Sequence, residues 1–196
     1  MRNTLDTLYR LSGGLAAFFL AAICAIVMAQ VGANIIDTIA VAVGAEPFGL
    51  VVPAYAEFTG FFLVAATFLA LANTLRAGSH IRVTLLIRGL GPAPKRWAEI
   101  WCTAVGFAFS AYFSWHAVWM VSDSYTFNDV SAGIVPVPLW IPQSPMAIGL
   151  IILTIALADE FVTVLKGRPP AYAKGDEGLL SDFTPEDAAA DVRERP

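Results

Sequence analysis

The chain has 196 residues, of which 57% are hydrophobic and only 14% charged, with a formal net charge of −4. A soluble domain carries about a quarter of its residues as charged side chains. The few charges here are also missing from long blocks of sequence, which excludes an ordinary water-soluble fold and indicates a chain solvated by lipid.

Four apolar blocks are long enough to cross a membrane, because a helix needs about 20 apolar residues to span a hydrocarbon layer about 30 Å thick. We expect the spans at about residues 11–36, 50–75, 98–121 and 145–165. The blocks lack the alternating pattern of barrel strands, and backbone groups in lipid must be satisfied within a helix or a closed barrel. The sequence therefore predicts an all-α integral membrane protein of four transmembrane helices.

The first predicted span is longer than the core of about 7–15 apolar residues in a signal peptide, so we interpret it as a retained helix. Small residues recur along it at every fourth position, namely Gly13, Ala17, Ala21, Ala25, Ala29 and Ala33. Helices in lipid associate by close packing, so this stripe predicts a contact face. Gln30 and Asn34, near one end, are expected to hydrogen-bond to a neighbouring helix.

The second predicted span contains one charged residue, Glu57, about two turns from its outer end. An acid inside a span is by default a candidate functional group. It can serve as an ion or proton site, or as a buried partner for a polar group on another helix or subunit. Its shallow depth favours the structural role.

The segment between the second and third spans has its own helical pattern. Val83, Leu86, Ile87 and Leu90 recur at positions that line one face of a helix, and Arg82 and Arg88 interrupt them. This pattern predicts a short amphipathic helix in the membrane interface, with its cations facing anionic lipid.

The third span carries a second stripe of small residues, Cys102, Gly106, Ser110 and Ser114, so one side of it can approach a neighbouring helix closely. Four prolines precede the fourth span, at positions 136, 138, 142 and 145. Proline lacks a backbone N–H, so we expect this stretch to be an extended lead into the last helix.

Lysine and arginine are distributed very unevenly among the loops. Residues 76–97 and both terminal segments carry them, whereas residues 37–49 and 122–140 contain none. Cytoplasmic loops are enriched in these residues, so we expect both termini and the middle loop in the cytoplasm. The predicted organisation is a cytoplasmic N-terminus (1–10), a four-helix membrane domain (11–166) and an acidic cytoplasmic tail (167–196) that is disordered.

The sequence lacks the motifs of common catalytic and cofactor sites. It has no zinc-protease, paired-cysteine, phosphate-loop, nucleophile-elbow or dinucleotide motif, and its two histidines, His80 and His116, fall on opposite sides of the membrane. We therefore predict neither an enzyme nor a cofactor, metal or nucleic-acid binder. A redox or enzymatic bundle would need ligand histidines or paired cysteines. A self-sufficient small homo-oligomeric transporter that uses Glu57 is the main alternative.

Three segments carry a resemblance to a known family. They are Pro53–Glu57, the run Leu75–Leu86 with its Gly-x-His-Ile-Arg-Val motif, and Gly133–Gly149, which contains Trp140 and Gln143. With its four spans, the chain resembles the DctQ-like family, the small membrane subunit of tripartite ATP-independent periplasmic (TRAP) transporters. Tyr55 stands where the family often has tryptophan, and Phe58 and Thr84 stand where it often has acids.

The resemblance implies a role in the bacterial inner membrane. Such a subunit is a non-catalytic scaffold in a heterodimer with a large membrane subunit, which carries out sodium-driven uptake of an organic acid-type solute. A periplasmic solute-binding protein delivers the solute and docks transiently.

The resemblance also suggests roles for individual residues. Glu57 would order the outer end of the second helix, and Arg76, His80 and Arg82 would organise the cytoplasmic end. Trp140 and Gln143 are further candidates for a structural or partner-interface role.

Overall fold

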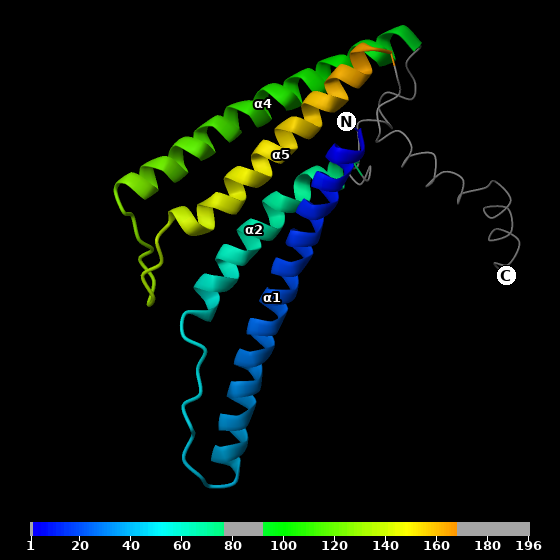
Figure 1. The fold of residues 1–196 in the computed structure, drawn as a ribbon. Coiled ribbons are helices and arrows are strands. Elements are labelled where there is room, and N and C mark those ends of the chain that lie inside the picture. The colour runs from blue at the N-terminus through cyan, green and yellow to red at the C-terminus, as the bar shows by residue number, and fades with distance from the viewer. Residues whose placement is uncertain (1, 77–91, 168–196) are drawn as a thin grey trace, which may run out of the picture.

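The computed structural model describes residues 2–76 and 92–167 (Figure 1). It contains the helices α1 (Arg2–Ala42), α2 (Tyr55–Arg76), α4 (Pro92–Thr126) and α5 (Trp140–Leu165). All four are long and apolar enough to cross a membrane, which confirms the predicted all-α membrane fold. Within the described ranges the only strand-like pairing is an isolated bridge between Val130 and Pro138. The predicted amphipathic helix and the acidic tail lie outside the described residues.

The helices form a row in the order α1, α2, α5, α4, and the main contacts join neighbours in this row. The α1–α2 and α4–α5 hairpins meet through α2 and α5, which run in the same direction (Figure 1). The hairpins converge near the N-terminus and diverge toward their connecting loops. We call these two ends of the molecule the N-terminal end and the loop end.

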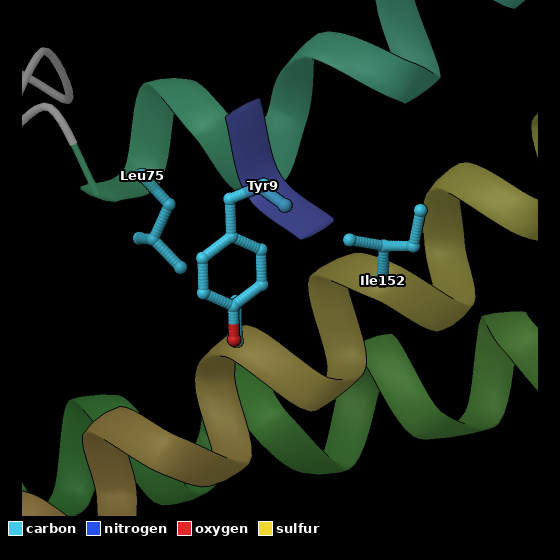
Figure 2. Close-up of a cluster of buried hydrophobic side chains, with 5 residues drawn as sticks. Tyr9, Leu75 and Ile152 are labelled. Atoms are coloured by element: carbon cyan, nitrogen blue, oxygen red, sulfur yellow. The ribbon is translucent and has the colours of Figure 1, made fainter. Parts of the chain in front are cut away.

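The hydrophobic core lies at the N-terminal end. Tyr9 of α1, only 1% exposed, lies between Leu75 of α2 and Ile152 of α5 (Figure 2). Ala72 and Ala156 complete the cluster. Small side chains let the backbones come close, so one aromatic ring is enough to join three helices.

Several helix boundaries differ from the sequence expectations, and α1 and α4 extend beyond the predicted spans at both ends. Helix α2 begins at Tyr55, so the first residues of the predicted second span are extended. Helix α5 begins at Trp140, so the prediction that residues 140–145 are non-helical was wrong. Pro142 lies in the first turn, where backbone N–H groups have no helical partner, and Pro145 is accommodated inside the helix.

Three of the four members of the stripe in the third predicted span pack against α5 as expected, whereas Cys102 is exposed. Gly106 faces Leu157 of α5, and the hydroxyls of Ser110 and Ser114 each lie 2.8 Å from the hydroxyl of Thr154. Thr154 donates its own proton to the carbonyl of Leu150 at 2.8 Å, so its oxygen accepts from both serines. This hydroxyl group therefore joins α4 to α5 in the middle of the hairpin.

The stripe in α1 behaves differently. Gly13 contacts Asn73 of α2, but the next four members of the stripe, Ala17, Ala21, Ala25 and Ala29, are exposed. Contact with α2 uses another face, through Ser12, which donates to the carbonyl of Leu69 at 2.5 Å, and through a Phe19–Phe62 ring contact. The prediction that the whole stripe is a contact face is therefore wrong for packing within this chain.

Candidate functional site

Glu57 lies in the first turn of α2, at the loop end, and its carboxylate contacts the α4–α5 loop. The carboxylate fills the space beside Gly133 so completely that a Cβ on residue 133 would overlap it. Its Oε2 atom is fully covered and has no hydrogen-bond partner among the described residues. Glu57 thus connects the beginning of α2 to the α4–α5 hairpin through close packing, and its Oε2 atom makes no hydrogen bond there.

The loop that receives Glu57 has a defined conformation. The Leu139 N–H donates to the Asp129 carbonyl at 2.9 Å, and the Ser131 N–H donates to the Val137 carbonyl at 2.8 Å. These bonds close a short hairpin around Gly133. The loop therefore presents a fixed surface at the end of α4 and α5.

Trp140 and Gln143 lie at the start of α5, also at the loop end. The Trp140 ring meets the ring of Tyr125 edge-on, with centroids 5.8 Å apart. This contact joins α4 and α5 at the loop end of their hairpin. The Oε1 atom of Gln143 is covered and lacks a hydrogen-bond partner within the described part of the chain.

Arg76 lies at the opposite end of α2. Its guanidinium forms an ion pair of 2.6 Å with Asp6 and lies 5.2 Å from the centroid of the Tyr9 ring. It therefore fixes the end of α2 to the beginning of α1, next to the hydrophobic core.

The predicted site residues do not form a single site. Glu57, Trp140 and Gln143 gather at the loop end, whereas Arg76 is about 28 Å away along α2 at 1.5 Å per residue. His80 and Arg82 lie outside the described residues. In the described ranges, no three histidine, cysteine or acidic side chains are grouped so that they could hold a metal ion.

A cavity of about 420 Å³ lies between α2, α4 and α5. Its lining is apolar except for one residue, and consists of Phe68, Phe113, His116, Ala117, Met120, Met146 and Leu150. Recognition of a carboxylate requires cationic or hydrogen-bonding groups, and this lining offers a single imidazole. The cavity is therefore poorly suited to an organic acid.

A family model describing the DctQ component of tripartite ATP-independent periplasmic transporters matches residues 39–167, about two thirds of the chain. The chain belongs to the DctQ family. The match includes α2, α4 and α5 and begins near the end of α1. Neither a curated protein nor a solved structure matches the chain. This DctQ-family chain is thus the small permease subunit of a TRAP transporter, a transport component that crosses the inner membrane several times.

Several residues that organise this DctQ-family chain were missed in the sequence. Asp6 and Tyr9 hold Arg76, Gly133 receives Glu57, and Thr154 joins the two serines of α4. The only sequence signal for Tyr9 was a polar aromatic residue beside an apolar block. Its partners lie on two distant helices, so their pairing depends on helix register.

Proposed function

We propose that this DctQ-family chain is a non-catalytic scaffold that forms a heterodimer with the large membrane subunit of the transporter. The large subunit performs sodium-driven uptake of an organic acid-type solute, which a periplasmic binding protein delivers. The observation that carries the proposal is the open row of helices, which leaves long apolar faces without a partner in the described part of the chain.

The exposed face of α1 is suited to packing against a helix of another subunit. Ala17, Ala21, Ala25 and Ala29 form a flat stripe along this face, and large side chains such as Phe18 and Met28 flank it. Small residues let two helix backbones approach closely, which is how helices associate in lipid. A helix of the large subunit fits such a surface better than disordered acyl chains do.

The placement of the polar groups favours a scaffold over a self-sufficient transporter. A transport path needs several converging polar groups near the middle of the membrane. The hydroxyls of Ser110, Ser114 and Thr154 occupy the middle of the α4–α5 hairpin, but they bond to one another. Glu57 lies at the loop end against Gly133 rather than at mid-span.

We further propose that the N-terminal end faces the cytoplasm and the loop end the periplasm, as the distribution of lysine and arginine predicts. The α4–α5 loop, which has a fixed shape, would then meet the binding protein. The membrane domain comprises residues 11–166, and residues 167–196 form a cytoplasmic tail. Glu57, Trp140 and Gln143 would serve the periplasmic end, and Arg76, His80 and Arg82 the cytoplasmic end.

Uptake into proteoliposomes tests the proposal. The large subunit is reconstituted with or without this chain, the binding protein and solute are added outside, and an inward sodium gradient is imposed. We expect uptake only when both membrane subunits are present, and no uptake with a potassium gradient instead. Sodium-driven uptake by this chain alone would support the alternative of a self-sufficient transporter, and undiminished uptake without it would exclude the scaffold.

A further inference from the structure

The connection between α1 and α2 exposes both apolar side chains and free backbone groups. We call residues 31–54 the elbow; it contains the last turns of α1 and the extended segment that leads to α2. Large apolar side chains project from the whole of it, with exposed fractions between 45% and 75% at Val31, Ile35, Ile36, Ile39, Val41, Val43, Phe48, Leu50 and Val51.

Two side chains of α1 hold the extended segment in place. Gln30 accepts a hydrogen bond from the Val52 N–H at 2.8 Å, and Asp37 accepts one from the Phe48 N–H at 2.9 Å. The segment therefore lies along α1 in a defined position, and it is extended even though it is as apolar as the helices beside it.

Between Phe48 and Tyr55, four other backbone N–H groups have no partner in the described part of the chain. Among the described residues, nothing accepts a hydrogen bond from the backbone of Gly49, Leu50, Val51 or Ala54. The nearby charges are acidic: Glu46 is exposed at the start of the segment and Asp37 lies beside it on α1, and the sequence has no lysine or arginine from Leu11 to Leu75.

Neither lipid nor water satisfies both features of the elbow. If the elbow lies in the hydrocarbon layer, its unpaired backbone groups are exposed to lipid, which membrane proteins avoid unless protein covers such groups. If it lies outside that layer, a contiguous apolar surface faces water, which marks an interaction site. Both positions require a protein surface that is apolar and also offers hydrogen-bond acceptors.

We infer that the elbow is a docking surface for the large membrane subunit, which covers residues 48–54 and accepts hydrogen bonds from their free N–H groups. An extended chain segment meets this requirement, as in other complexes where an exposed backbone edge is paired by a partner. The acidic flanks favour a partner segment that carries lysine or arginine. A soluble protein fits less well, because Val52 is held against α1 at Gln30, about 10 Å closer to the membrane interior than Asp37.

This inference rests on the proposed function, and hydrogen exchange measured by mass spectrometry distinguishes the failure of each. Exchange in residues 48–54 is compared between this chain alone in lipid nanodiscs and the complex with the large subunit in the same nanodiscs. The matched control is residues 132–135 of the other connecting loop, whose N–H groups also lack partners among the described residues.

We expect exchange in residues 48–54 to slow at least tenfold in the complex, whereas the control loop keeps its rate. In addition, a benzoylphenylalanine photo-crosslinker in place of Phe48 should attach to the large subunit. A complex that forms without slowing exchange would overturn the inference and leave the scaffold proposal standing. If exchange in residues 48–54 is already slow in this chain alone in nanodiscs, lipid covers the elbow and the inference is wrong. Absence of any complex would remove both proposals.

Discussion

Gly149 of α5 packs directly on the backbone of Phe68 in α2: a Cβ on residue 149 would lie 2.5 Å from both the carbonyl carbon and the carbonyl oxygen of Phe68. At this position the backbones of the two hairpins are in direct contact. The close packing of α5 on α2 at this position therefore depends on the absence of a side chain at residue 149.

Gly149→Ala is therefore expected to weaken the contact between the hairpins. Backbone cannot move aside as a flexible side chain does, so we expect a loss of about 1–3 kcal/mol in the free energy of unfolding, measured by thermal unfolding in detergent. Gly60→Ala is the matched control, since a Cβ at residue 60 of α2 meets nothing within 4 Å. Equal stability of the two variants would contradict the packing described.

The hydroxyl of Thr154 is expected to matter more than either serine that bonds to it. Thr154→Val leaves Ser110 and Ser114 without their shared acceptor, and we expect a loss of about 1 kcal/mol, the usual scale for such bonds in membrane proteins. Ser114→Ala removes only one of the two bonds and should lose less. If the serine variant is the less stable one in the same unfolding assay, the shared-acceptor arrangement is wrong.

The Tyr9 ring and its hydroxyl are expected to contribute differently to stability. The ring fills the core, whereas the hydroxyl is covered and has no hydrogen-bond partner in the described chain. Tyr9→Phe should therefore leave the free energy of unfolding unchanged or raise it by up to about 1 kcal/mol. Tyr9→Ala should lower it by about 3–5 kcal/mol, because three helices lose their common contact. A large loss in the phenylalanine variant would reveal a partner for the hydroxyl.

Glu57 and Gly133 are expected to be energetically coupled, because the carboxylate occupies the space that a side chain at residue 133 would need. Gly133→Ala alone should destabilise the loop end by about 1–3 kcal/mol. The same substitution should be much less harmful in a Glu57→Ala background, where the space is free. A double-mutant cycle on thermal unfolding measures this coupling, and strictly additive effects would show that the two residues do not touch.

Much of the fold follows from the sequence because lipid imposes simple requirements. Charge-free blocks between Arg10, Asp37, Glu99 and Asp123 marked two of the spans, and the spacing of Gly106, Ser110 and Ser114 marked a true contact face. The same spacing in α1 did not identify the face that meets α2. Small residues show where a helix can be approached, but not whether the neighbour belongs to the same chain.

The candidate site was less accessible to sequence reasoning. Glu57 stood out as the one acid inside a predicted span and Arg76 as the charge at its end, but their partners Gly133 and Asp6 are 76 and 70 residues away. Pairing over such distances depends on which helices are neighbours, and composition does not determine that order. The helical start of α5 was missed because proline is costly inside a helix but acceptable in its first turn.

Co-purification with the large subunit tests the central claim most directly. This chain is tagged, expressed together with the large membrane subunit of its transporter and extracted in a mild detergent, and the mass of the purified particle is measured. The scaffold proposal predicts one large subunit for each copy of this chain, with no bound cofactor. A particle that contains only copies of this chain would contradict it, and would direct attention to Glu57 as the centre of a self-sufficient transporter.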